Sequence, residues 1–412
     1  MNYKEALAWL YSLQRFGIKL GLENIQRLIA ELHVDLGNAR VIHVAGTNGK
    51  GSVCAMIDAV CHAQKYRTGL FTSPHLVTFR ERIRVNGEMI SENEVAAGLT
   101  NIRKLVADWE PHPTFFEIAT ALALKHFAEA KACPEQDRGV DIVILETGLG
   151  GRLDATNAIQ SDVAVITPIA LDHEQWLGDS VEKIAAEKAG IIKPQTPVVS
   201  APQVAEVGKV IRARAAECEA PLQFVDEAYD KSPIALRGQH QKLNAALAIA
   251  AIRAAKIDIG DAAITRGLAT VEWPGRFQCW DKRTVIDGAH NPAAARTLAQ
   301  SWGEIFGDER ATVILAVLSD KDLKAIGEIF SPISDSILLP KIRTERAVEP
   351  VDLQKVFVDL GRESETLASF GEAFAKARQR AAPILITGSL HFAGEALAHL
   401  QGRPAAFEEC AQ

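Results

Sequence analysis

Amphipathic segments alternate with short apolar runs along most of the chain, and this alternation predicts helices and strands. Apolar residues recur at helical spacing over residues 3–15, 22–33, 92–109 and 114–131. Continuous apolar runs, typical of strands buried on both faces of a parallel sheet, cover residues 140–145 and 162–167. The alternation therefore predicts an α/β protein with a parallel-rich sheet.

A second series of the same kind follows residues 272–277, where Pro274 and Gly275 interrupt the pattern. Because proline and glycine together mark loops, we place a domain boundary there. We expect an N-terminal phosphate-loop ATPase-type domain over residues 1–274 and a smaller C-terminal Rossmann-like α/β domain over residues 275–412. Strands of the second domain are expected at residues 284–286, 311–318, 336–339 and 383–387.

The composition is that of an ordinary globular protein. The 412 residues are 48% hydrophobic and 24% charged, enough chain for two or three domains. A net charge of −7 argues against a nucleic-acid binder that works by bulk charge. The N-terminal segment carries Lys4, Glu5 and Arg15 and has no apolar core, so no signal peptide is expected. No apolar run reaches the roughly 18 residues that a membrane span needs.

The six cysteines are scattered and form no Cys-x-x-Cys pair. We therefore expect reduced, buried thiols in a cytoplasmic protein, and neither a zinc site nor a disulfide framework. They are Cys54, Cys61, Cys133, Cys218, Cys279 and Cys410.

The most informative segment, residues 41–52, reads VIHVAGTNGKGS. It predicts a strand, a glycine-rich turn and a helix that starts at Ser52. The three glycines permit positive φ, so that free N–H groups and the positive helix end form a cradle for a polyphosphate. Lys50 supplies charge to phosphate oxygens, and Ser52 offers a hydroxyl to Mg²⁺. The alternative is a strand-to-helix turn with an incidental lysine. The residues assigned to ATP here are Gly46, Thr47, Asn48, Gly49, Lys50, Gly51 and Ser52.

The loop departs from the common phosphate-loop pattern, because Gly51 separates Lys50 from Ser52. In this departure it resembles the ATP loop of the Mur-ligase superfamily and, within it, the folylpolyglutamate synthase family. At least seven ordered motifs over nearly the whole chain carry the same resemblance. They include TSPHL at 72–76, ETGLGGRLDATN at 146–157, EKAGIIKP at 187–194, PGR at 274–276, DGAHNP at 287–292 and TGSL at 387–390.

The resemblance implies two Mg²⁺ ions at the carboxyl ends of the strands. Glu146, at the end of an apolar run and before a glycine-rich loop, is a suitable Mg²⁺ ligand from its position alone. The resemblance adds Ser73 as a ligand beside Ser52, and places His173 at the second ion. Read without it, Ser73 initiates a turn with Pro74, and His173 is a structural histidine.

A capping box with Asp179 as N-cap predicts a helix that ends at Gly190. A lysine on such a helix is normally a surface charge. The resemblance alone makes Lys188 a carbamylated lysine, in which CO₂ converts the amine into an anionic oxygen ligand near the second Mg²⁺.

The resemblance also implies a pterin pocket, in which Asp154 hydrogen-bonds the ring. Phe115 and Phe116 can stack on a flat heterocycle, although core aromatics are an equally good interpretation. A surface helix start is the alternative for residues 21–23. The pocket residues are Gly21, Leu22, Glu23, Thr114, Phe115, Phe116, Glu117, Leu153, Asp154 and Ala155.

The resemblance completes the ATP and glutamate sites. Arg276 lies on the ATP phosphates, where a guanidinium suits bidentate contact better than an ammonium. Asn244, at the expected start of a helix, contacts adenine; a polar capping turn is the alternative. Asp287 and His290 lie near the nucleotide, and Ser389 and His290 lie beside the incoming amino acid. N-caps and strand ends are the alternatives in this domain.

Together these residues predict an ATP-dependent amide-bond-forming ligase. No side chain is placed as a nucleophile, so a substrate carboxylate is implied to attack ATP and form an acyl phosphate. The amine of L-glutamate then displaces phosphate, with His290 as the candidate base. Mg²⁺ and Lys50 neutralise the transferred group. The implied acceptors are dihydropteroate, giving dihydrofolate, and reduced folates, giving folylpolyglutamates.

Two alternatives stay open, namely a folate-extending ligase without dihydropteroate activity and a phosphate-loop kinase or NTPase. Gly51 and residues 287–291 count against the second. A Mur ligase acting on a sugar nucleotide is disfavoured, since no domain of about 100 residues precedes the phosphate loop at Gly46. We expect a cytoplasmic monomer that binds small molecules and neither nucleic acid nor membrane.

Overall fold

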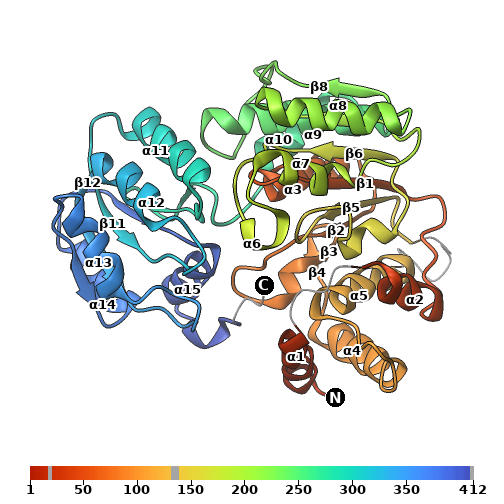
Figure 1. Ribbon diagram of the computed structural model, residues 1–412, viewed down its shortest axis with the longest axis horizontal. Coiled ribbons are helices and arrows are strands. Elements are labelled where there is room, and N and C mark those ends of the chain that lie inside the picture. Colours follow the sequence, from red (N-terminus) through yellow and green to blue (C-terminus); the bar gives the residue numbers. More distant parts are fainter. Residues whose placement is uncertain (17–20, 131–138, 409–412) are drawn as a thin grey trace.

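The computed structural model describes residues 1–16, 21–130 and 139–408, and within them the chain forms two mainly parallel β-sheets (Figure 1). The first sheet has eight strands in these residues, in the order β4-β3-β2-β5-β1-β6-β7-β8. Only β3 and β4 run antiparallel to their neighbours in it. The strands are β1 Arg40–Ala45, β2 Thr68–Phe71, β3 Ile83–Val85, β4 Glu88–Met89, β5 Ile142–Glu146, β6 Val163–Ile166, β7 Val198–Ser200 and β8 Leu222–Phe224.

Helices cover both faces of this sheet, which explains why its central strands read as continuous apolar runs. Along β5, Val143 and Leu145 pack into the core beneath α1, α2, α4 and α5. Ile142 and Ile144 point to the opposite face and pack against α3, α9 and α10. The α-helices are α1 Tyr3–Ser12, α2 Glu23–Glu31, α3 Lys50–Ala63, α4 Glu92–Leu105, α5 Phe115–Glu129, α6 Glu174–Leu177, α7 Val181–Ala189, α8 Ala205–Glu217, α9 Gln239–Ala254 and α10 Asp261–Thr270. Short 3₁₀ helices are η1 Leu13–Phe16, η2 Phe79–Arg82 and η3 Ala155–Ala158.

The second sheet belongs to the smaller C-terminal domain, drawn in blue and cyan in Figure 1. Among the described residues it has six strands, in the order β13-β12-β11-β14-β10-β9, and only β9 is antiparallel. The strands are β9 Gln278–Cys279, β10 Thr284–Ile286, β11 Ala311–Leu315, β12 Ser334–Pro340, β13 Glu365–Leu367 and β14 Ile384–Thr387. The helices are α11 Pro292–Phe306, α12 Leu323–Phe330, α13 Pro350–Asp359, α14 Phe370–Arg378 and α15 Leu390–Leu400, with η4 Ser331–Ile333 and η5 Pro404–Ala406.

Several local expectations were wrong. The N-cap of α7 is Ser180, whose hydroxyl accepts from the Lys183 amide, and not Asp179. Helix α9 begins at Gln239, five residues before Asn244, and α3 begins at Lys50 rather than at Ser52.

Three cysteines are buried as expected, but Cys279 is exposed at the edge strand β9. Residues 17–20, within a turn that the sequence predicts from Gly17 to Gly21, lie outside the described residues, as do residue 131 of an expected helix, Cys133 and Cys410. Every helix in the described part of the chain is too short or too polar to cross a bilayer.

Candidate active site

The glycine-rich turn between β1 and α3 has the expected shape. Gly46 and Gly49 adopt φ of 149° and 90°, values that favour glycine. The amides of Thr47 and Asn48 both donate to the Pro168 carbonyl, at 3.0 and 3.2 Å. The amides available to an anion are therefore those of the first turn of α3, which have no intrahelical acceptor.

Gly51 is helical, so the expectation that it uses positive φ was wrong. A Cβ at this position would lie 2.7 Å from the indole Nε1 of Trp273. The inserted glycine thus lets Trp273, next to the domain boundary, pack against the first helical turn of the phosphate loop. Lys50 folds back over the turn, and its Nζ donates to the carbonyls of Gly46 and Thr47 at 3.2 and 3.3 Å.

Asn244 lies beside the phosphate loop. Its Oδ1 would be 2.9 Å from a Cβ at Gly49, and its Nδ2 donates to Gln241 Oε1 at 3.0 Å. Gln241 in turn reaches the buried hydroxyl of Ser52 at 3.5 Å. The two predicted ATP residues are therefore linked through Gln241, to which the sequence motif gave no role.

Ser73 and Glu146 meet at the carboxyl ends of β2 and β5. The Ser73 amide donates to Glu146 Oε2 at 3.1 Å, while the Ser73 hydroxyl is buried without a hydrogen-bond partner among the described residues. Burial raises the pKa of Glu146, and the nearby Lys50 and Arg276 charges offset part of that rise. Ser73, Glu146 and Arg276 share a cavity of about 30 Å³.

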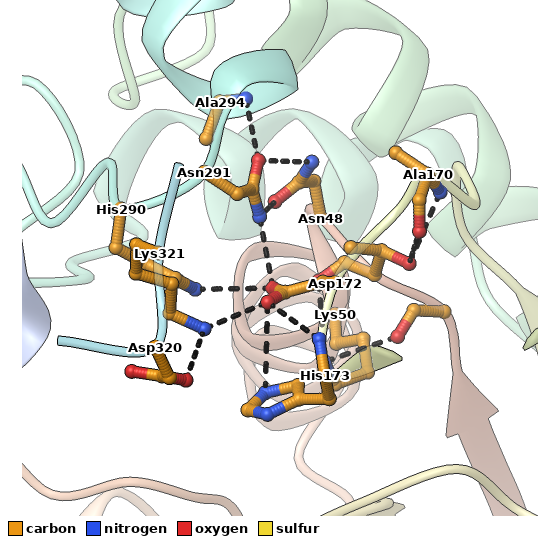
Figure 2. Close-up of polar contacts among 12 residues, drawn as sticks. Asn48, Lys50, Ala170, Asp172, His173, His290, Asn291, Ala294, Asp320 and Lys321 are labelled. Carbon is orange, nitrogen blue, oxygen red and sulfur yellow. Dashed lines mark hydrogen bonds and ion pairs between the residues drawn. The ribbon is translucent and has the colours of Figure 1, made fainter. Parts of the chain in front are cut away.

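Asp172, six residues past the end of β6, is the centre of a polar network between the domains (Figure 2). Its carboxylate accepts hydrogen bonds from two side chains of the C-terminal domain, from Lys321 Nζ at 2.7 Å and from Asn291 Nδ2 at 3.0 Å. The side chains of Asn291 and Asn48 exchange hydrogen bonds at 3.1 and 3.3 Å, which connects the network to the phosphate loop. Burial tends to raise the pKa of Asp172, but the hydrogen bond and charge of His290, with Lys321, hold it well below its usual range.

His290 has acceptors at both ring nitrogens. Nδ1 lies 2.8 Å from the Gly288 carbonyl, and Nε2 lies 3.5 Å from Asp172 Oδ2. A carbonyl and a carboxylate only accept, so a proton on either ring nitrogen has an acceptor within reach.

His173 and Lys188 lie in the same region but are held differently. His173, at φ 53°, precedes α6, and burial lowers its pKa to about 4, which keeps the imidazole neutral. Lys188 on α7 is buried, contrary to the usual surface position of a helical lysine. Burial and the Lys50 charge lower its pKa to about 7, so that a neutral amine is accessible near neutral pH.

A cavity of about 470 Å³ lies between the domains and brings most of the predicted pterin and glutamate residues together. Leu22 and Glu23 are not among its lining residues. The predicted residues that line it are Gly21, Thr114, Phe115, Phe116, Glu117, Leu153, Asp154, Ala155, His173, His290 and Ser389.

Several of these lining residues already form hydrogen bonds with their own loop or helix start. The Asp154 carboxylate accepts four hydrogen bonds, from the amides of Gly148, Leu149 and Thr156 and from the Thr156 hydroxyl. Thr114 and Glu117 form the capping box of α5. Asp287, outside this cavity, likewise accepts from its own loop, through the amides of Phe277 and Ala289 at 2.7 and 2.8 Å. These side chains shape the walls of the site.

Two family models match the chain: the Mur ligase middle domain over residues 44–217 and the Mur ligase glutamate ligase domain over residues 275–390. The dihydrofolate synthase/folylpolyglutamate synthase of Bacillus subtilis is 34% identical, over 95% of this chain and 97% of its own length. This chain belongs to the dihydrofolate synthase/folylpolyglutamate synthase family of Mur ligases. The resemblance predicted from the motifs is confirmed.

Solved members of the family have the same two-domain α/β fold, which confirms the predicted fold class. Escherichia coli FolC in complex with DHPP and ADP matches with a TM-score of 0.85 and 33% identity, over 96% of this chain and 98% of that one. A bifunctional folylpolyglutamate synthase/dihydrofolate synthase with Mn, AMPPNP and L-glutamate bound matches with a TM-score of 0.84 and 32% identity, again over 96% and 98%.

The family motifs did not point to every residue of the site. Asp172, Asn291 and Lys321 were missed, although each lies next to or within a segment that was singled out. Trp176, exposed on α6 at the rim of the large cavity, was also missed. Among the described residues, no group of three or more His, Cys, Asp and Glu side chains has a metal-binding arrangement. The predicted ion sites depend instead on serines and a lysine in addition to Glu146 and His173.

Proposed function

We propose that this chain is an ATP-dependent ligase that joins L-glutamate to dihydropteroate, giving dihydrofolate, and to reduced folates, giving folylpolyglutamates. The observation that carries the proposal is the cavity of about 470 Å³ between the domains. Phe115 and Phe116 line it from the N-terminal domain, and His290 and Ser389 line it from the C-terminal domain. The aromatic wall suits a flat pterin, and the polar wall suits an amino acid.

ATP would lie with its phosphates at the first turn of α3, where the amides and the helix dipole favour anions. Lys50 and Arg276 supply the positive charge, and Asn244 and Asp287 complete the nucleotide site. An acceptor carboxylate attacks the γ-phosphorus of ATP, and the bond from that phosphorus to the bridging oxygen breaks. ADP departs, and the acceptor carboxylate has become an acyl phosphate. The glutamate amine adds to the acyl carbon, loses a proton, and phosphate departs.

The residues present fit a divalent ion at Ser73 and Glu146. The buried, unpaired Ser73 hydroxyl and the adjoining cavity of about 30 Å³ offer oxygen donors and room for one ion. We assign Ser52 to the same ion, and His173 with carbamylated Lys188 to a second. Mg²⁺ bound there would neutralise charge on the phosphates.

We keep His290 as the candidate base for the glutamate amine. It lies beside Asp172 on the cavity wall where the glutamate carboxylates and departing phosphate would lie. Arg346 lines the same wall and adds positive charge for an acidic substrate, whereas the charge of Lys321 is paired with Asp172 and Asp320.

The domain boundary at residues 274/275 and a cytoplasmic monomeric state belong to the same proposal. The two sheets support the boundary, since their strands come from residues 40–224 and 278–387. Gel filtration with light scattering tests the monomer, which a stable dimer at assay concentration contradicts.

The first experiment measures ADP release from MgATP with L-glutamate in the presence of dihydropteroate, of a reduced folate, or of neither. Turnover with both acceptors and none without them is the expected result. Turnover with the reduced folate alone would identify a folate-extending ligase. ADP release independent of acceptor and glutamate would overturn the ligase and favour a kinase or NTPase.

A further inference from the structure

Beside the large cavity, each of the two domains sends a segment onto the other. The loop at residues 74–79 leaves the N-terminal domain, and its Leu76 is buried in the core of the C-terminal domain. A Cβ at Gly394 on α15 would lie 1.9 Å from the Leu76 carbonyl oxygen, so the loop backbone rests directly on this helix.

Residues 404–408 make the reverse crossing, from the C-terminal domain onto the N-terminal one. Arg343 donates to the Pro404 carbonyl at 3.1 Å, and the Phe407 ring meets the His391 ring edge-on at 5.0 Å. The segment then passes Val77, whose carbonyl accepts from the Glu408 amide at 2.8 Å. We name residues 74–79 together with residues 404–408 the clasp.

Glu408 closes the clasp through its carboxylate. It accepts from the Tyr3 hydroxyl of α1 at 3.0 Å, from the Thr78 hydroxyl at 3.0 Å and from the Phe79 amide. His75 Nε2 lies 3.3 Å from the Glu408 carbonyl. One residue of the C-terminal domain thereby fixes the loop at three successive points and ties it to the first helix.

We propose that Glu408 is a positioning residue that holds the 74–79 loop against the substrate cavity. The loop begins directly at Ser73 and Pro74; Pro74 lines the large cavity, and Ser73 lines the smaller one beside Glu146. His391, the partner of Phe407, lines the large cavity from the other domain. Losing the Glu408 carboxylate leaves the fold in place but lets this wall move, so acceptor binding weakens more than chemistry slows. The kinetic part of this inference rests on the proposed function.

The test compares Glu408→Ala, Glu408→Gln and the control Glu363→Ala, which removes an exposed carboxylate of the same domain. The readouts are hydrogen exchange of the Phe79 amide, which donates to Glu408, and KM and kcat for the acceptor. The Val77 and Thr78 amides donate to Glu81 and serve as internal controls. Glu408→Ala should speed that exchange and raise the acceptor KM about tenfold, as expected for lost hydrogen bonds to a charged group, with kcat changed less than about threefold. Glu408→Gln keeps an acceptor for the Phe79 amide and should behave nearly like wild type.

Unchanged exchange and unchanged KM in Glu408→Ala would overturn the inference, and so would a lowered melting temperature with wild-type KM. If Glu408→Ala does not fold, Tyr3→Phe and Thr78→Val each remove one hydroxyl that donates to Glu408. Each of these variants must then raise the acceptor KM, by less than the shift expected for Glu408→Ala. If wild type does not ligate glutamate, the proposed function fails, while the exchange readout still decides whether Glu408 holds the loop.

Discussion

At the scale of single residues, burial decides chemistry that residue type alone does not. Lys188 and Lys183 lie on the same helix α7, yet Lys188 is buried and Lys183 is exposed beside Asp179. Burial lowers the pKa of Lys188 to about 7, which makes accessible near neutral pH the neutral amine that the proposed carbamylation requires. The sequence motif identified the residue, but only the packing explains how it can react.

Lys188→Ala should lower kcat about 10- to 100-fold, the range for groups that support a metal site, whereas Lys183→Ala should leave it unchanged. Because the pKa of Lys188 is lowered on folding, the unfolded state binds more protons between about pH 7 and its ordinary value of 10.5. The free energy of unfolding should therefore rise with pH in that window and lose this slope in the variant. ADP release and denaturant titrations at several pH values check both; normal turnover would remove the carbamate.

Asp154 illustrates a residue whose proposed ligand role competes with a local one. Its two oxygens already accept four hydrogen bonds from its own loop. We expect Asp154→Ala to lower the free energy of unfolding by about 2 kcal/mol, since hydrogen bonds to a buried charged group are lost. The kcat/KM for dihydropteroate and for reduced folate should fall alike. A selective loss of dihydropteroate use with unchanged stability would instead support direct contact with the pterin.

At the scale of elements, the loop after β5 is placed by its contact with the end of α7. The Arg152 amide donates to the Glu187 carbonyl at 2.7 Å, and a Cβ at Gly151 would lie 2.8 Å from the Lys188 carbonyl oxygen. The loop that carries Leu153 and Asp154 and the end of the helix that carries Lys188 are thus held together by a close backbone approach that only glycine allows.

Gly151→Ala should lower the free energy of unfolding by about 1–3 kcal/mol, because the clash is with backbone and cannot be relieved by a rotamer change. Gly303→Ala is the matched control, since a Cβ there meets nothing within 4 Å on helix α11. It should raise the free energy of unfolding by about 0.5–1 kcal/mol through helix propensity. Chemical denaturation measures both, and equal effects would contradict the contact.

Element types were predictable where burial dictates composition, and element ends were not. Strand β6 and the first four residues of β5 are apolar because both faces of these strands are covered, so their apolar runs located them. The start of α7 was misplaced because Asp179 and Ser180 are equally good N-cap types. The start of α9 was misplaced because its first turn is polar and its N-cap, Gly238, makes no side-chain bond.

At the scale of the whole molecule, the site exists only when the domains meet. Lys321 and Asp172 are 149 positions apart, and each is buried, at 6% and 7% side-chain exposure. From sequence alone, a lysine in the polar segment at residues 319–322 is expected to be a surface charge. No sequence pattern around Lys321 indicates that it pairs with Asp172. Motifs therefore located the phosphate loop and both walls of the cavity, while the network that joins them came from tertiary structure.

Lys321→Met should lower the free energy of unfolding by about 3–5 kcal/mol, because it leaves the Asp172 charge buried with one fewer cation. The control Lys341→Met breaks an exposed pair with Glu349 and should cost less than about 1 kcal/mol. Thermal and denaturant unfolding compare the two variants. A small effect of Lys321→Met would mean that His290 and Asn291 suffice to hold Asp172.

The strand order has a consequence for how the chain acquires this structure during synthesis. Strand β1, which carries the phosphate loop, pairs only with β5 and β6 among the described strands, and those lie about 100 residues later in the chain. At about 10 residues per second of synthesis, β1 waits roughly ten seconds for its first neighbour. Such distant pairing also makes folding slow. The nucleotide cradle, encoded near the N-terminus, is thus not fixed until about 100 further residues have been made.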